Sequence, residues 1–238
     1  MTDDLYLSRL TLKRNPEISA LIGTLQPLDS GEAAEAGHRL VWSVMPPAVR
    51  AAKDERRSRG DERTTMLWRH EEGGIYYVLG PKPELRSSLF DIETRPFEAA
   101  LAPGDRLRFM LRVHATVDRR AGGRATARRS DVVMDLLSSV PKDERSSLRL
   151  QKAHEAASGW MKRRGEADGF ELEGVAVDSY KVQLLARERG RVRSHGIGVL
   201  DLQGLVAVTE PDRFIARLRT GFGRAKAFGC GLMLIRRA

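Results

Sequence analysis

The chain has 238 residues, enough for one large domain or for two smaller ones that each bury a core. Lysine and arginine total 41 against 32 acidic residues, a net charge of +9, which favours an anionic partner such as nucleic acid. The single cysteine, Cys230, excludes an internal disulfide and a cysteine-rich zinc site. No signal segment opens the chain and no uncharged run reaches membrane-spanning length, so we expect a cytoplasmic protein with no membrane partner.

The N-terminal half reads as strand, helix, hairpin and strand. Apolar and polar residues alternate over 5–13, and Asn15-Pro16 breaks that strand. Apolar residues at helical spacing predict a helix over 32–45, capped by Ser30 and ended by Pro46, whereas the charged stretch 50–63 is typical of a solvated loop. The remaining predicted elements are strands at 65–68, 75–79 and 89–94, with a hairpin turn at 71–74. This order predicts a ferredoxin-like domain over 1–100 whose second helix is reduced or missing.

The C-terminal half repeats this plan after a joint at 101–105. We expect strands at 107–117, 180–185 and 197–208, and a helix that Ser130 caps. A second amphipathic helix places Leu150, Ala153, Ala157, Trp160 and Met161 on one stripe. Thr209 and Asp212 form a capping-box start for a short helix that Gly221 ends, before a final strand. The fold class expected is therefore α+β, with tandem ferredoxin-like (RRM-like) domains over 1–100 and 105–238.

A glycine-rich segment precedes the final strand. It contains Gly221, Gly223, Gly229 and Gly231, with Arg224 and Lys226 between the two pairs. Glycines permit φ > 0 and close backbone approach, and we expect Gly223 or Gly229 to adopt a conformation that is costly for a side chain. The spacing fits neither a dinucleotide fingerprint nor a Walker loop. Two interpretations stay open: a loop that holds a phosphate backbone, or a turn that packs the last strand against a helix.

The pattern glycine-apolar-glycine, five residues, glycine-apolar-glycine, placed before a last strand, resembles the signature loop of the CRISPR-associated repeat-processing endoribonucleases. Within these enzymes the chain is most similar to the CasE subtype, the crRNA-processing subunit of Cascade. The opening residues 5–10, Leu-Tyr-Leu-Ser-Arg-Leu, resemble the first strand of that subtype. The resemblance implies tandem ferredoxin-like domains, a CRISPR repeat RNA hairpin (pre-crRNA) as substrate, and other Cascade subunits as partners.

His38 is the candidate catalytic residue. Residues 38–46, His-Arg-Leu-Val-Trp-Ser-Val-Met-Pro, resemble the helix segment in which CasE enzymes hold a catalytic histidine, followed four residues later by tryptophan. Several relatives place a tyrosine three residues before that histidine, where this chain has Glu35, so the tyrosine's auxiliary role is not carried over. Taken without the resemblance, His38 is better explained as a histidine on a half-buried helix face.

Two arginine clusters are candidate RNA contacts. Arg119, Arg120, Arg124, Arg128 and Arg129 form the first, which can equally be a solvated loop, while Arg187, Arg189, Arg191 and Arg193 alternate and would share one side of a strand. Aromatic residues are only 6% of the chain, so phosphates of a folded stem suit it better than stacked single-stranded bases. The predicted RNA-binding set is Arg124, Arg128, Arg129, Lys181, Arg187, Arg189, Arg191, Arg193, Gly221, Gly223, Arg224, Lys226, Gly229 and Gly231.

No histidine pairs with other ligands at metal-binding spacing, so we expect no metal and no cofactor. RNA can then be cut by its own 2′-hydroxyl, with His38 transferring a proton and basic residues offsetting the charge that develops on the phosphate. DNA lacks that nucleophile and is expected to be inert. The alternative is a non-catalytic RNA-binding or assembly subunit on the same fold, because a fold does not fix an activity.

Overall fold

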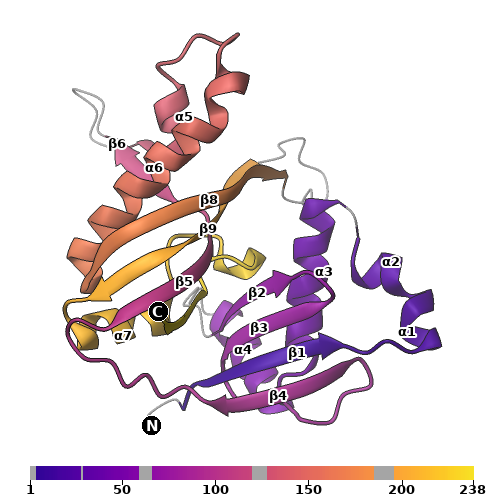
Figure 1. The fold of residues 1–238 in the computed structure, drawn as a ribbon. Helices are drawn as coiled ribbons and strands as arrows, with labels where there is room; N and C mark the ends of the chain where they lie inside the picture. The colour runs from indigo at the N-terminus through magenta and orange to yellow at the C-terminus, as the bar shows by residue number, and fades with distance from the viewer. Residues whose placement is uncertain (1–3, 28, 59–65, 120–127, 185–195) are drawn as a thin grey trace. The chain divides into compact units, whose positions relative to one another are not determined.

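The computed structural model describes residues 4–27, 29–58, 66–119, 128–184 and 196–238, and the chain divides into two compact units (Figure 1). The first unit comprises Met1–Ala99, Leu184–Ser194 and Lys226–Leu232. The second comprises Ala100–Gln183, His195–Ala225 and Met233–Ala238. Two short segments from the C-terminal half therefore belong to the first unit. Within the described residues, no helix is long and apolar enough to cross a membrane.

The first unit is built on a four-stranded sheet. Its elements are β1 (Tyr6–Leu12), α1 (Pro16–Ala20), α2 (Ile22–Leu25), α3 (Ser30–Ser43), α4 (Pro47–Ser58), β2 (Leu67–Glu71), β3 (Ile75–Gly80), β4 (Phe90–Pro96) and the 3₁₀ turn η1 (Lys226–Phe228). The strand order is β2-β3-β1-β4 and all neighbours are antiparallel, which is the ferredoxin-like arrangement. Residues 81–89, between β3 and β4, contain no helix, so the missing second helix is confirmed.

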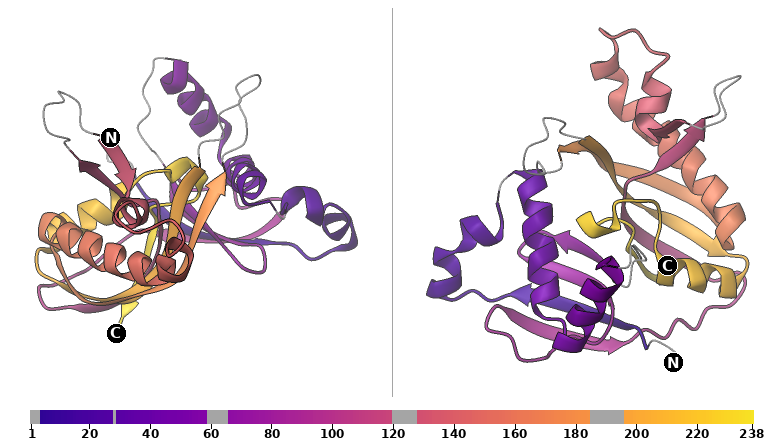
Figure 2. Two further views of the ribbon diagram at one scale, coloured as in Figure 1. Left: turned by 90° about the horizontal axis from the view of Figure 1, so that it is seen from above. Right: turned by 180° about the vertical axis from the view of Figure 1, so that it is seen from behind.

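The core of the first unit lies between this sheet and α3 (Figure 2). The helix contributes Leu40 and Val41, and the residues directly after it contribute Val44 and Met45, all nearly inaccessible to solvent. The sheet contributes the fully buried Leu10 and Tyr76, whose ring meets Phe90 edge-on at a centroid distance of 5.8 Å. Burying apolar side chains of this size stabilises the fold by roughly 1.5–3 kcal/mol each, so the rotation of α3 about its axis is well determined.

The local predictions for the first unit needed three corrections. Asp29, not Ser30, caps α3, because its Oδ1 accepts the backbone N–H groups of Gly31 and Glu32 at 2.9 and 3.0 Å. Asn15-Pro16 ends β1 but also starts α1, since Asn15 caps it and proline suits the first helical position. The interpretation of 50–63 as a loop was wrong for 50–58, which belong to α4.

The second unit repeats the arrangement. Its elements are β5 (Arg106–Val113), β6 (Thr116–Arg119), β7 (Arg128–Asp131), α5 (Val132–Leu137), α6 (Arg145–Asp168), β8 (Phe170–Leu184), β9 (Gly196–Val208), α7 (Pro211–Thr220) and β10 (Met233–Arg237). The main sheet has the order β10-β5-β9-β8, and β6 pairs with β7 in a separate ribbon. Phe170 packs against Phe214 and Phe222 at centroid distances of 5.2 and 6.2 Å. The predicted α+β class with two ferredoxin-like sheets is confirmed.

In the second unit, too, the sequence predicted that the helices exist more reliably than which residues cap their N-termini. Asp131, not Ser130, caps α5 by accepting from Val133 and Met134. The predicted capping box at α7 does not form, because Glu210 occupies the N-cap position and makes no side-chain cap bond. Gly221 ends α7 as predicted, at φ 76°. Leu150 is 62% exposed, so the apolar stripe of α6 begins at Ala153.

The predicted strand boundaries in this unit also shift. The expected strand 107–117 is two strands, β5 and β6, because His114, one of the two residues between them, bridges to Arg224 instead of continuing the ladder. The expected strand 180–185 begins ten residues earlier, at Phe170.

Candidate active site

His38 lies near the middle of α3, half-buried, one turn before the core residues of that helix. The Asp29 cap fixes where the helix starts, and the buried residues Leu40, Val41 and Val44 fix which side faces the sheet. Together they determine the direction in which the imidazole projects.

Both ring nitrogens of His38 have hydrogen-bond partners within the first unit. Nδ1 lies 3.1 Å from the carbonyl oxygen of Ala227, and Nε2 lies 3.2 Å from Nζ of Lys53. A carbonyl only accepts and an ammonium only donates, so the hydrogen is assigned to Nδ1 and a lone pair to Nε2. These partners select the neutral tautomer in which Nε2 is the base.

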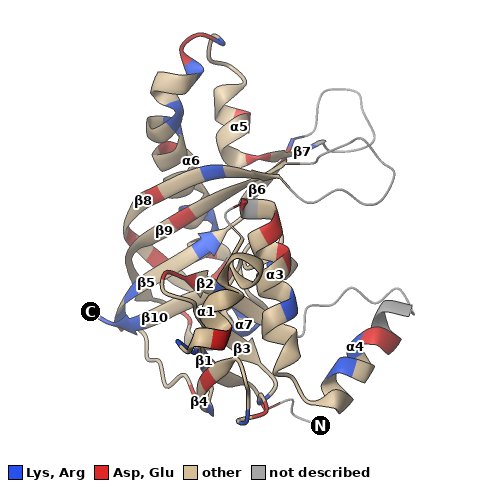
Figure 3. Cartoon of the chain, turned by 90° about the vertical axis from the view of Figure 1, so that its right-hand side faces the viewer, with Lys and Arg blue, Asp and Glu red and all other residues tan. Residues whose placement is uncertain are grey.

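Lys53 is the residue that sequence reasoning missed. It lies on α4, a helix of interleaved basic and acidic residues (Figure 3). Its ammonium also lies 3.8 Å from the centroid of the Trp42 ring, a cation–π contact, and that ring lies 6.1 Å from the imidazole of His38. The available signal was Pro46-Pro47, because a second proline after a helix end can occupy the first position of a new helix.

The glycine-rich segment has the backbone that its sequence predicts. Gly221, Gly223, Gly229 and Gly231 all have φ between 63° and 96°, and Ala225 joins them at 57°. A Cβ on Gly223 would lie 2.5 Å from Val113 Cγ2 and 2.7 Å from the His114 carbonyl oxygen, both in the second unit. A Cβ on Gly229 would lie 3.1 Å from the Trp68 ring in the first unit. The expected strain is confirmed, and protein contacts account for these two glycines.

The η1 turn within this segment completes the surroundings of His38. It begins at the half-buried Lys226 and carries Ala227, whose carbonyl meets Nδ1 of His38. Arg224 is exposed, and its backbone N–H donates to the His114 carbonyl at 3.1 Å. Lys226 is thus one residue from the group that orients His38, whereas Arg224 belongs to the second unit.

Two arginines of the first cluster are already paired with carboxylates. Arg119 donates to Asp135 at 2.6 Å, and Arg129 donates to Asp118 at 2.7 Å, which lowers the pKa of the Asp118 carboxyl. Residues 119–129 contain no acidic residue, yet carboxylates on either side of this stretch pair with two of its arginines. Arg128 lies in β7 and Lys181 is exposed on β8. Arg120, Arg124, Arg187, Arg189, Arg191 and Arg193 lie outside the described residues.

His114 has a structural environment. Its Nδ1 lies 2.8 Å from the Gly198 carbonyl oxygen and 3.8 Å from Asp131 Oδ2. Asp131 also accepts from the Tyr180 hydroxyl at 3.0 Å, and burial, followed by the neighbouring carboxylate, raises the pKa of Tyr180. This network joins the end of β5 to α5 and β8. Among the described residues, no group of three or more histidine, cysteine or acidic side chains is placed to hold a metal ion.

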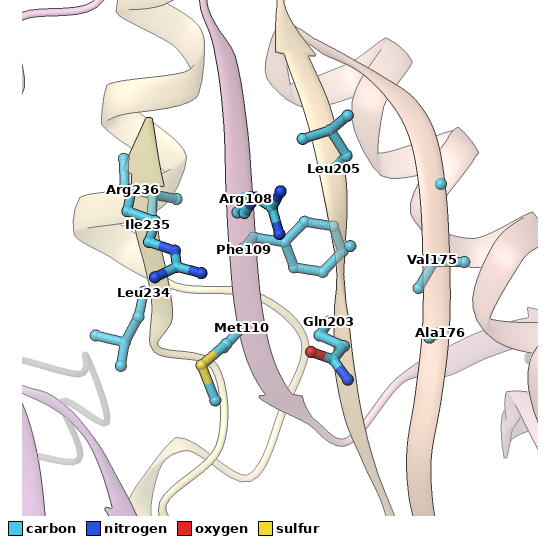
Figure 4. A pocket seen from close by; sticks show the side chains of 12 residues that line it. Arg108, Phe109, Met110, Val175, Ala176, Gln203, Leu205, Leu234, Ile235 and Arg236 are labelled. Atoms are coloured by element: carbon cyan, nitrogen blue, oxygen red, sulfur yellow. The ribbon is translucent and has the colours of Figure 1, made fainter. Parts of the chain in front are cut away.

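A pocket on the sheet of the second unit is a competing location (Figure 4). It is lined by apolar side chains such as Met110, Leu205 and Leu234, with Arg108 and Arg236 at neighbouring positions of β5 and β10. None of its lining side chains transfers a proton near neutral pH. The pocket is therefore no candidate for acid–base chemistry, and His38 remains the better one.

Two ferredoxin-like sheets, a histidine on the first long helix and a glycine-rich segment with positive φ before the last strand are the features on which the resemblance to the CRISPR-associated endoribonucleases rests. The chain matches the family described as CRISPR associated protein over residues 5–237 and belongs to that family.

Individual relatives agree with this assignment. The chain is 27% identical over 229 residues to the CRISPR-associated endoribonuclease Cse3 of Thermus thermophilus, covering 89% of this chain and 86% of that protein. It is similar to the structure of Thermus thermophilus Cse3 bound to an RNA representing a pre-cleavage complex, with a TM-score of 0.63, 25% identity and coverage of 98% and 99%. The CRISPR-associated protein Cas6e of Escherichia coli K-12 shares the fold, with a TM-score of 0.58, 18% identity and coverage of 98% and 100%.

Proposed function

We propose that this protein is a metal-independent endoribonuclease that binds the stem-loop of CRISPR repeat RNA and cuts pre-crRNA at the 3′ base of the hairpin. The observation that carries the proposal is the orientation of His38, whose Nδ1 is held by the Ala227 carbonyl and whose Nε2 bears the lone pair. A neutral imidazole in this tautomer is a general base suited to neutral pH. The family membership and the named activity of the Thermus relative support the same reaction.

The chemistry needs only the RNA and a proton acceptor. Nε2 of His38 takes the proton of the 2′-hydroxyl as the O2′–P bond forms, and the P–O5′ bond breaks. The leaving 5′-oxygen is protonated by solvent, so the products are a 2′,3′-cyclic phosphate and a 5′-hydroxyl. Cations near the phosphate stabilise the charge that develops on its oxygens. Lys226, one residue from Ala227, and the alternating arginines are our proposed sources.

The proposed RNA contacts are the glycine-rich segment with Arg224 and Lys226, the exposed Lys181 and the two arginine clusters. They would grip the phosphates of the hairpin stem without reading stacked bases. We further propose that the processed RNA stays with a Cascade-type complex whose other subunits are the protein partners, as the CasE resemblance implies. A pre-crRNA substrate would place this activity in the cytoplasm.

Cleavage is expected to proceed in EDTA and to stop when the nucleotide before the cut carries 2′-deoxyribose. The substituted RNA keeps its phosphates, so it should still bind, but it lacks the nucleophile. A labelled repeat hairpin, its deoxy-substituted version and end-group analysis of the products measure this. A 5′-phosphate product, or cleavage only after magnesium is added, would falsify the 2′-hydroxyl mechanism. Binding of unmodified RNA without any cleavage would favour the non-catalytic subunit instead.

Neutralising Arg187, Arg189, Arg191 and Arg193 together should weaken hairpin binding and flatten its dependence on salt. Each phosphate contact releases condensed counterions, so losing contacts reduces the slope of log K against log salt concentration, by about 0.7–0.9 per contact. Binding titrations at several salt concentrations give the slope. An Arg106→Gln, Arg213→Gln variant is the comparison, because these arginines are paired with Glu173 and Glu210 and lie outside the proposed RNA contacts. An unchanged slope in the fourfold variant would remove this segment from the RNA interface.

A further inference from the structure

The ammonium group of Lys53 lies between two groups of the candidate site. It is 3.2 Å from Nε2 of His38 and 3.8 Å from the centroid of the Trp42 ring. Lys53 is half-buried, and its position depends on α4, which begins only four residues after α3 ends. The contact is thus built into the fold of the first unit.

A cation at this distance disfavours protonation of the imidazole. An imidazolium would face the ammonium as a like charge, whereas the neutral ring accepts one of its N–H bonds at Nε2. Close to His38 in the chain, Glu35 and Arg39 of α3 form an ion pair at 3.8 Å, and Lys226 begins η1, whose Ala227 carbonyl meets Nδ1. Lys53 is a charged group at hydrogen-bond distance from Nε2, so its charge acts directly on that nitrogen.

The same contact has a cost for catalysis. While Lys53 donates to Nε2, the lone pair of His38 is occupied and cannot accept the proton of a 2′-hydroxyl. A phosphate oxygen is a stronger partner for an ammonium than a neutral imidazole, because the resulting hydrogen bond joins opposite charges. RNA brought to within reach of Nε2 also brings its scissile phosphate within reach of Lys53.

We propose that Lys53 is a transferable cation that first sets and then releases the general base. In the free protein it stabilises neutral His38, and when RNA binds its ammonium moves to a non-bridging oxygen of the scissile phosphate, which frees Nε2. The proposal rests on the function proposed above and adds a residue to it. Lys53 keeps its proton throughout: the 2′-hydroxyl proton goes to Nε2, the O2′–P bond forms, the P–O5′ bond breaks, and the 5′-oxygen is protonated by solvent.

Lys53→Met should cut the repeat hairpin about 10²-fold more slowly than the parent under single-turnover conditions, the usual effect of losing one charge-stabilising donor. The acidic limb of its pH profile measured at sub-saturating protein, which reports the free protein, should move to higher pH, because His38 loses the adjacent cation that kept it neutral. Lys53→Arg, which keeps a cation, should recover most of the rate and restore the limb. Lys82→Met is the matched control, since Lys82 lies 5.6 Å from the Tyr6 ring in a similar contact without His38.

A phosphorothioate at the scissile position tests the second half of the transfer. Replacing the non-bridging oxygen that Lys53 contacts should slow the parent more than Lys53→Met, which no longer makes that contact. Equal sensitivity in the two proteins would overturn transfer to the phosphate. If the parent cuts and Lys53→Met, with a parent-like thermal melt, matches its rate and pH profile, the Lys53 proposal fails while the proposed function stands. A parent that does not cut at all would instead remove the proposed function.

Discussion

His38→Ala should slow cleavage of the cognate hairpin by about 10²- to 10⁴-fold, the range typical of losing a general acid or base. Affinity for the uncut hairpin should stay close to that of the parent, because the proposed phosphate contacts come from other residues. The imidazole is half-buried at the side of the core rather than within it, so folding should be little affected. Single-turnover cleavage, hairpin binding and a thermal melt on the same preparation separate these effects.

His154→Ala is the matched control for that experiment. His154 is an exposed residue of α6 in the second unit, and its Nε2 hydrogen-bonds the Val175 backbone carbonyl at 3.0 Å. The His154→Ala variant loses an imidazole from a helix outside the candidate site, so its cleavage rate should match that of the parent. A parent-like rate in His38→Ala would show that His38 is not catalytic, and catalysis would then depend on positioning of the RNA by basic residues.

Gly223→Ala should destabilise the protein by about 3 kcal/mol, combining a strained left-handed backbone with a forced displacement of packed atoms. The added Cβ would lie 2.7 Å from a backbone oxygen, that of His114, which cannot rotate away as a flexible side chain can. For a chain of this length the melting temperature should fall by roughly 10 °C. Differential scanning calorimetry or circular dichroism on heating measures the change.

Two other glycines of the second unit separate the causes. Gly104 has φ 87° with nothing within 4 Å of its would-be Cβ, so Gly104→Ala carries only the backbone cost. Gly174 has ordinary φ and the same open space, so Gly174→Ala should be nearly neutral. If Gly223→Ala and Gly104→Ala have the same melting temperature, the close contact with Val113 and His114 adds nothing to the loss of stability. If all three variants have the same melting temperature, neither the positive φ of Gly223 nor its contacts stabilise the fold, and the glycine-rich segment only connects α7 to β10.

Periodicity predicted the sheet-forming strands and the long helices because apolar residues facing a core repeat at fixed intervals. It failed for α4, where Arg50, Lys53, Asp54 and Glu55 give the charged composition of a loop. That helix forms with a proline at its first position and few apolar residues to reveal it. Lys53 could therefore not be predicted as a partner of His38, because its position depends on α4, and the composition of that segment indicated a loop.

The chemistry of the candidate site was predictable only in part. His38 was found by resemblance of its segment, and the positive φ values of the glycine-rich segment followed from residue type. The Ala227 carbonyl could not be found, because any residue has one and only the fold brings it to Nδ1. Likewise, Asp118 and Asp135 neutralise Arg129 and Arg119 through pairing of β6 with β7 and through α5, which linear charge counting does not register.

The hydrogen bond between His38 and Ala227 joins positions 189 residues apart within one compact unit. A gene fragment ending at residue 99 would encode His38, Lys53 and Trp68, but neither the carbonyl that sets the tautomer nor the glycine against the Trp68 ring. Swapping C-terminal halves between relatives would likewise exchange part of the first unit along with the second. The first compact unit therefore includes residues from near the end of the chain. A mutation close to the last strand can for this reason affect His38 on the first long helix.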